Sequence, residues 1–157
     1  MLLNGPTGES NRYRLLARGP VWALPRTQLG LVHQVAAALA TGNPCHVVLP
    51  AQDNGCAAAW QALRAAAGDA GVVWLHSADD QSWGDAQAPI TALLFEGDGD
   101  ALVGITTAVA ARAGAIVRVE SRSSEALHAG HGYDLAALLH EQSISTNTAA
   151  AGGNAQL

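Results

Sequence analysis

The stretch from Arg18 to Pro50 constrains the fold more than any other part of the chain. It holds two short apolar runs, Val21–Leu24 and Cys45–Leu49, each followed by proline. Between them, residues 28–41 lack proline and place leucine, valine and alanine on one helical face. Gly42 then supplies a left-handed cap where this helix ends. The order strand, helix, strand predicts a βαβ unit whose two strands lie parallel and are covered on both faces.

The same alternation continues through the middle of the chain. Helical patterns run from the Asp53-Asn54 pair to about Ala67 and from Leu102 to Gly114. The apolar runs that alternate with them are Val72–Leu75, Leu93–Phe95 and Ala115–Val119. Apolar strands that alternate with helices are typical of a parallel sheet covered on both faces. The sequence therefore predicts an α/β fold, a Rossmann-like three-layer sandwich with a mainly parallel sheet of about five strands.

Polar strand patterns occur at both ends of the chain. Residues 12–17 alternate apolar and polar side chains, which predicts a half-exposed N-terminal edge strand. Residues 142–148 alternate Ile144 with serine, threonine and asparagine, which predicts a polar C-terminal strand. This strand lies in a C-terminal tail, residues 141–157, that has too few apolar residues to form a core of its own.

Between the predicted sheet and this tail, the composition changes. Residues 121–132 are rich in serine, glycine and histidine, which indicates a loop. Tyr133–His140 has the spacing of a short amphipathic helix. No internal repeat divides the chain, so we expect one Rossmann-like domain over residues 1–157.

Charge and composition exclude several functions. The net charge is −5, and no basic cluster occurs that would bind nucleic acid. All eight basic residues are arginines, so a phosphate-loop lysine and a Schiff-base lysine are both excluded.

The context of the chain is also constrained by what it lacks. No apolar run reaches the ~20 residues of a membrane span, and no signal peptide is evident at Met1, so we expect a cytoplasmic protein without a membrane span. Cys45 and Cys56 fall in a predicted strand and a predicted helix, and we interpret both as reduced core residues.

Gly97-x-Gly99 lies between a predicted strand and a predicted helix, where a dinucleotide-binding turn belongs. Leu102 occupies the position of the third glycine, and Asp98 and Asp100 would repel a pyrophosphate. We interpret these two aspartates as helix caps. The sequence names no cofactor-binding residue in this chain.

Histidines gather in the second half of the chain and suggest a metal cluster. His128 and His131 belong to the predicted glycine-rich loop, with His140 and Glu141 downstream. No cysteine accompanies them and no regular element fixes their spacing, so a solvated loop is the favoured interpretation and no residue is assigned as a metal ligand.

The βαβ unit resembles the opening of the cofactor domain of aldehyde dehydrogenases, which share its first strand, the helix ending AAALAxGNP and the second strand. Glu120 matches the position of that family's general-base glutamate, but Ser121-Arg122-Ser123 replaces its Leu-Gly-Gly. No cysteine follows Cys56, and a thiohemiacetal requires a thiol downstream of this strand. The sequence therefore names no catalytic residue.

Both ends of the chain resemble the C-terminal domain of the proline utilization A family, a non-catalytic domain of the aldehyde dehydrogenase superfamily. The most specific match is EQSISTNTAAAGGNA, from Glu141 to Ala155. The resemblance implies a fragment of a larger bifunctional enzyme with proline dehydrogenase and L-glutamate γ-semialdehyde dehydrogenase activities. That enzyme would use FAD and NAD in its catalytic domains, with no cofactor in this one.

The resemblance also implies a role in assembly. The domain would cover the cavity through which the intermediate passes. Its expected partner is the semialdehyde dehydrogenase domain of the parent chain, or a second copy through the C-terminal tail. The predicted interface residues are Ser143, Ser145, Asn147, Thr148, Gly152, Gly153 and Asn154.

A freestanding small-molecule or nucleotide-binding module on a Rossmann-like sheet is the alternative. Such a module would carry a glycine fingerprint after the first strand. That turn reads Leu24-Pro25-Arg26-Thr27-Gln28, without glycine.

Overall fold

The computed structural model describes residues 1–5, 8–52, 54–67, 73–76, 82–85 and 88–148. They form two compact units. One unit, Ala17–Leu139, contains the large sheet and its helices. The other combines Met1–Leu16 with the strand residues from His140 onward. Each unit is described by itself below.

Five parallel strands form the sheet of the larger unit, as the sequence predicts. They lie in the order β5-β4-β3-β6-β7. The central strands are short and buried because they are covered on both faces. The strand bounds are β3 Val21–Leu24, β4 Cys45–Val48, β5 Val73–His76, β6 Ala92–Glu96 and β7 Arg118–Arg122.

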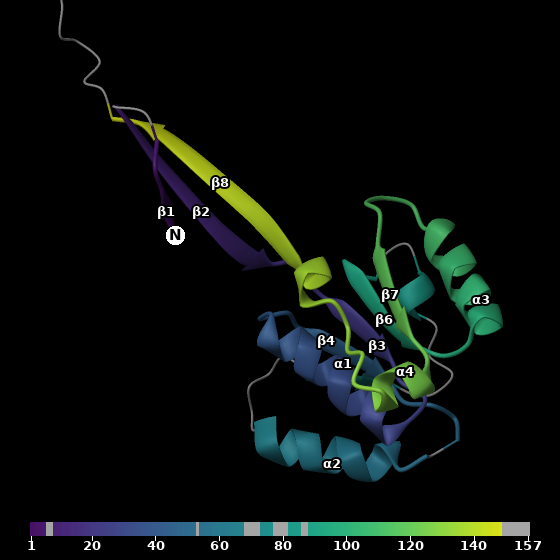
Figure 1. The fold of residues 1–157 in the computed structure, drawn as a ribbon. Coiled ribbons are helices and arrows are strands. Elements are labelled where there is room, and N and C mark those ends of the chain that lie inside the picture. The colour runs from purple at the N-terminus through teal and green to yellow at the C-terminus, as the bar shows by residue number, and fades with distance from the viewer. Residues whose placement is uncertain (6–7, 53, 68–72, 77–81, 86–87, 149–157) are drawn as a thin grey trace, which may run out of the picture. The chain divides into compact units, whose positions relative to one another are not determined.

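Helices cover both faces of this sheet and complete the three-layer architecture (Figure 1). On one face α1 (Gln28–Ala40) and α2 (Cys56–Ala67) pack on alternate strand residues such as Val21 and Ala23. On the other face α3 (Gly99–Ala110) and the 3-10 turn η1 (Ser82–Gly84) pack against Trp22, Leu93 and other strand residues. Because successive residues of a strand point to opposite faces of the sheet, the strands contribute side chains to two separate cores.

The last strand of the large sheet, β7, begins three residues later than predicted. The sequence pattern places it at Ala115–Val119, but β7 is Arg118–Arg122. Ile116 is 96% exposed, so the apolar run does not lie in the sheet throughout. An edge strand tolerates polar side chains, and the apolar pattern therefore misplaced its start.

The predicted loop over residues 121–132 instead contains the end of β7 and a short helix, α4 (Ser124–His128). The hydroxyl of Ser123 caps this helix by accepting a hydrogen bond from the amide of Ala126, and Leu127 is buried. Serine here starts a helix and does not mark a loop.

The predicted helix Tyr133–His140 is also wrong. Only Leu135–Leu138 is helical, as the 3-10 turn η2, and the next two residues begin strand β8. The carboxylate of Asp134 caps the turn by accepting a hydrogen bond from the amide of Ala136 at 2.9 Å. Apolar spacing alone does not distinguish one 3-10 turn from an α-helix.

The smaller unit contains a three-stranded sheet in the order β1-β2-β8, with strand bounds Leu2–Leu3, Glu9–Ala17 and Leu139–Asn147. The division between the units falls at the last residue of β2 and the first residue of β8. The predicted edge strand over residues 12–17 is part of β2 and lies in the middle of this sheet, because β1 and β8 flank it. Sequence periodicity cannot reveal a partner strand more than a hundred residues away. The predicted polar strand is confirmed as β8, and it lies at the edge of its sheet.

Candidate functional site: the carboxyl edge of the large sheet

Ligands of doubly wound sheets bind at the carboxyl ends of the strands, where the strand order reverses. Here that point lies between β3 and β6, because the chain proceeds from β3 to β4 on one side and continues through β6 and β7 on the other. Glu96, the last residue of β6, lies at this point and is fully buried. A buried carboxylate at the reversal makes this edge the candidate site.

Four hydrogen-bond donors surround the carboxylate of Glu96. Oε2 accepts from the amides of Arg26 at 2.7 Å and Thr27 at 2.8 Å. Oε1 accepts from the hydroxyls of Thr27 at 2.7 Å and Ser124 at 2.8 Å. Burial raises the pKa of Glu96, but these hydrogen bonds outweigh burial and leave the pKa below its ordinary value. The group is therefore an ionised carboxylate whose oxygens are already fully engaged.

The same carboxylate completes the N-terminus of α1. Thr27 is the N-cap, and its hydroxyl accepts from the amide of Gly30 at 3.0 Å. In a capping box, a glutamate at the Gly30 position would accept from the amide of the N-cap residue. Here Glu96, at the end of β6, accepts the hydrogen bond from the amide of Thr27. A Cβ atom on Gly30 would lie 1.9 Å from Oε2 of Glu96. The missing side chain of Gly30 thus provides the space that the carboxylate fills.

Tyr133 closes the inner side of this site. Its hydroxyl donates to the carbonyl of Phe95 at 3.0 Å and accepts from Nε2 of Gln34 at 2.8 Å, while the guanidinium of Arg122 lies 5.7 Å from the ring centroid. Burial raises the pKa of Tyr133 above its ordinary value, so this phenol does not ionise at neutral pH. The hydroxyl is a structural bridge between β6 and α1.

Glu120, the match to a general base, is held in ion pairs. Its carboxylate lies 3.0 Å from Nε of Arg118 and 3.8 Å from Nη1 of Arg122. The cysteines lie elsewhere: Cys45 begins β4, at the opposite end of the strands, and Cys56 begins α2. Both are buried as expected, and burial raises the pKa of the Cys45 thiol to about 12.

The acidic turn before α3 acts as a cap, as the sequence indicates. Oδ1 of Asp98 accepts from the amide of Ala101 at 2.9 Å, and Oδ2 lies 3.2 Å from Nη1 of Arg26. The hydrogen bond from Ala101 is the main reason that the pKa of Asp98 is lowered, followed by the one from Arg26. The N-terminus of α3 therefore already has its anion.

The histidines weighed as a metal cluster do not lie together in one element. His128 ends α4, where its Nδ1 lies 2.8 Å from the carbonyl of Ser124, and His140 belongs to β8 of the other unit. In the described ranges, no three histidine, cysteine or acidic side chains form a group that could hold a metal ion.

Among the residues that the structure describes, no helix combines the length and apolar character needed to cross a membrane.

Four of the predicted interface residues, Ser143, Ser145, Asn147 and Thr148, are exposed on or just after β8. Within the smaller unit, the amide of Thr148 donates to the carbonyl of Gly8 at 2.7 Å, and the hydroxyl of Ser145 donates to Asn11. The other three, Gly152, Gly153 and Asn154, lie outside the described residues.

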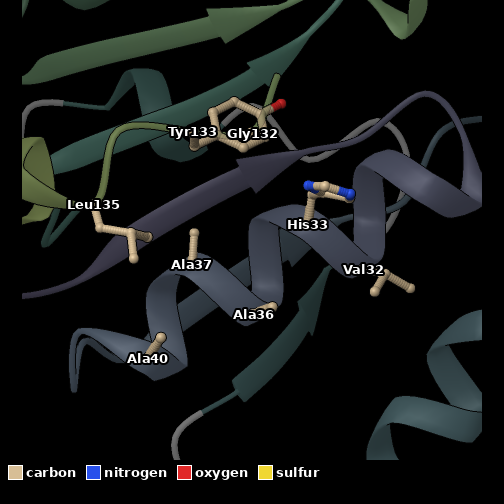
Figure 2. Close-up of a pocket in the computed structure, with 8 residues that line it drawn as sticks. All are labelled: Val32, His33, Ala36, Ala37, Ala40, Gly132, Tyr133 and Leu135. Carbon is tan, nitrogen blue, oxygen red and sulfur yellow. The ribbon is translucent and has the colours of Figure 1, made fainter. Parts of the chain in front are cut away.

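A shallow apolar groove of about 350 Å³ runs along the outer side of α1 (Figure 2). Its walls come from α1 and from the segment that leads into η2, including the first residue of that turn. The lining residues are Val32, His33, Ala36, Ala37, Ala40, Gly132, Tyr133 and Leu135. His33 is the one basic side chain in this lining, and no carboxylate or hydroxyl-bearing residue other than Tyr133 lines it. Such a lining offers few of the polar groups that fix a cofactor or a small acid.

One cluster was not predicted from sequence. On the α3 face of the sheet, the ring of Trp22 stacks on His46 at 4.9 Å and on His76 at 4.5 Å between centroids. Nδ1 of His46 lies 3.0 Å from Nε2 of His76, so one imidazole donates to the other. The signal in the sequence is that β3, β4 and β5 each place an aromatic or imidazole side chain on this face: Trp22 pairs with His46, and His76 lies opposite Val48, two residues further along the same face.

We expect the free energy of unfolding to decrease as the pH is lowered and His46 becomes protonated. Burial and the neighbouring His76 lower the pKa of His46, so the unfolded chain takes up its proton first as the pH falls below about 6.5. His46→Gln should remove this part of the pH dependence between pH 7 and 5. Because His46 is partly exposed, the effect is on the order of a few tenths of a kcal/mol. Urea denaturation against pH measures it, with the exposed His131→Gln as control; parallel profiles of the His46 variant and the unsubstituted chain would contradict it.

Known proteins resemble this chain in both sequence and fold. The chain is 41% identical over 156 residues to bifunctional protein PutA of Rhizobium meliloti, and 38% identical over 157 residues to the protein of the same name in Escherichia coli K12. Each match covers 99% of this chain, yet the chain spans only 12% and 11% of those proteins. No family model matches the chain.

Solved structures give the same result. A crystal structure of a Bradyrhizobium japonicum proline utilization A variant superposes on 78% of this chain with a TM-score of 0.68 and 28% identity, and this chain covers 13% of it. An NAD-dependent benzaldehyde dehydrogenase from Corynebacterium glutamicum superposes on 78% with a TM-score of 0.63 and 19% identity, over 28% of its own chain. The second likeness concerns the fold alone.

Proposed function

Because the chain is homologous, along nearly its whole length, to one segment of bifunctional protein PutA, we propose that it serves as a non-catalytic domain of a proline-catabolic enzyme. The homology is the observation that carries this proposal. In that enzyme, proline dehydrogenase and L-glutamate γ-semialdehyde dehydrogenase domains would carry out the chemistry, with FAD and NAD as their cofactors. This domain would cover the cavity through which the intermediate passes and support domain assembly in the cytoplasm.

The contacts and burial of the potentially reactive side chains support a domain without catalytic activity. Glu120 is engaged by Arg118 and Arg122, and the Cys45 thiol is buried. The carboxyl edge of the sheet, where a ligand belongs, is filled by Glu96 and its four donors. The same occupancy disfavours a freestanding nucleotide-binding module, which would need that crevice open.

NAD is expected not to bind this chain with useful affinity. The chain has no lysine for a nicotinamide ribose, and Asp98 already occupies the N-terminus of α3. Calorimetry of the purified chain against NAD is the test. A dissociation constant at or below ~10 μM, which corresponds to about −7 kcal/mol, would defeat the prediction.

The covering role is proposed for β8 and the residues after it. β8 is an edge strand with seven of its nine residues exposed, so it has little apolar surface to hold it in a core. Edge strands of this kind bind other chains by main-chain pairing. The partner we propose is the semialdehyde dehydrogenase domain, or a second copy of this chain when it is alone.

Deleting residues 143–157 from the full-length enzyme tests this role. We expect proline oxidation to remain largely intact, because no catalytic group is removed. NADH formation from proline should become slower or show a lag, because the intermediate escapes from an uncovered cavity. Val103→Ser, an exposed change on α3, is the matched control. A deletion variant that makes NADH from proline at the undiminished rate and without lag would refute the covering role.

A further inference from the structure

The site around Glu96 has the form of an anion-binding site that is already occupied. The first amides of a helix point outward without partners inside the helix, and they attract anions. At α1 the amides of Arg26 and Thr27, which lead into the helix, converge on Oε2 of Glu96 at 2.7 and 2.8 Å. The anion in this site is thus a side chain of the protein itself, supplied by β6.

The surroundings of this carboxylate are also built for it. The first residue of α4 contributes the hydroxyl of Ser124, and the hydroxyl of Thr27 donates to the same oxygen, Oε1. Gly30 leaves the carboxylate room, since a Cβ atom there would lie 2.5 Å from Cδ of Glu96. Donors at the N-termini of α1 and α4, together with a position without a side chain, therefore form a cradle of the size of one carboxylate.

We propose that Glu96 is a built-in ligand that closes a small-carboxylate site at the reversal point of the sheet. While its side chain is present, the site admits no free anion. Truncation of Glu96 to alanine removes one methylene and the carboxylate, which together match acetate. The emptied cradle then binds acetate, with the four donors in their present places.

Chemical rescue of Glu96→Ala in the full chain tests the proposal. The variant should melt at a lower temperature than the unsubstituted chain, and acetate should raise its Tm in a saturable manner. We expect a dissociation constant on the order of 10 mM for so small a ligand. At ten times that concentration, the Tm of the variant should rise by about 3–5 °C. Chloride at equal ionic strength should not produce this rise.

Matched variants separate a specific site from a general salt effect. Glu96→Gln should show no rescue, because its amide fills the cradle. Asp98→Ala removes an exposed capping carboxylate and should gain no more from acetate than the unsubstituted chain does. Equal acetate effects on Glu96→Ala, Asp98→Ala and the unsubstituted chain would overturn the proposal.

A second measurement covers the case in which Glu96→Ala does not fold. Ser124→Ala removes one of the four donors and leaves the carboxylate and its backbone donors in place. In the unsubstituted chain, the carboxyl carbon resonance of Glu96 should titrate at lower pH than that of an exposed glutamate, and Ser124→Ala should move this titration upward. A resonance that titrates with the exposed glutamates, and does so equally in both proteins, would show that the cradle is not occupied by this carboxylate.

Discussion

Replacing Gly30 with alanine is expected to lower the free energy of unfolding by about 3 kcal/mol or more. The new Cβ atom would lie 1.9 Å from Oε2 of Glu96. The carboxylate cannot move aside cheaply, because it is buried and accepts four hydrogen bonds from Arg26, Thr27 and Ser124. The substitution therefore displaces a charge from its donors and opposes the gain that alanine normally gives in a helix.

Gly104→Ala is the matched control, because Gly104 lies within α3 and a Cβ atom there meets no atom within 4 Å. This change should stabilise the chain by up to about 1 kcal/mol, the difference in helix propensity between the two residues. Both values come from urea denaturation. Similar small gains from both substitutions would show that the carboxylate yields freely at Gly30.

A double variant tests the cause directly. In the Glu96→Ala background the obstacle is absent, so Gly30→Ala should cost nothing or stabilise the chain. Gly30→Glu in the same background should restore part of the lost stability, since Thr27 followed three residues later by glutamate forms an ordinary capping box. If Gly30→Ala were equally costly with and without Glu96, its cost would lie in α1 itself.

The sheet and its main helices were predictable because their signals are local. Apolar runs such as Val21–Leu24 end at proline, and buried parallel strands need no partner information to be recognised. The polar strand β7 was misplaced because its register depends on β6, where Ala92 pairs with Arg118. The short helix α4 was missed because one capping serine and one buried leucine, Leu127, decide it.

The candidate site was only partly predictable for the same reason. The role of Asp98 as a helix cap was predicted from the turn at residues 97–100 alone, and the structure confirms it. Glu96 receives its donors from residues 26, 27 and 124, so no window of sequence contains the cluster. Two signals do exist: an acidic residue closes an apolar strand, and Thr27 is followed by glycine where a capping glutamate belongs.

Arg112→Met is expected to cost about 3 kcal/mol, the second large effect that the structure predicts. The guanidinium of Arg112 donates to the carbonyls of Trp83 at 2.7 Å and Ala88 at 2.8 Å, and also to that of Asp85. It thereby ties the segment around η1 to the end of α3, and this segment carries the buried Trp83. Methionine keeps an apolar stem and leaves all three carbonyls without this donor.

Lysine at the same position distinguishes geometry from charge. Arg112→Lys keeps the positive charge but cannot reach three carbonyls with one compact ammonium group, so it should recover less than half of the loss. Arg64→Met, in the last turn of α2, is the control for removing an arginine from a helix end, and should change stability by about 0.5 kcal/mol or less. Tryptophan fluorescence and hydrogen exchange of the amide of Asp85 report on the η1 segment itself. The prediction would be contradicted if Arg112→Met unfolded at the same urea concentration as the unsubstituted chain and the amide of Asp85 stayed protected from hydrogen exchange. In that case the packing of Trp83 alone would hold η1, and the guanidinium would add no stability.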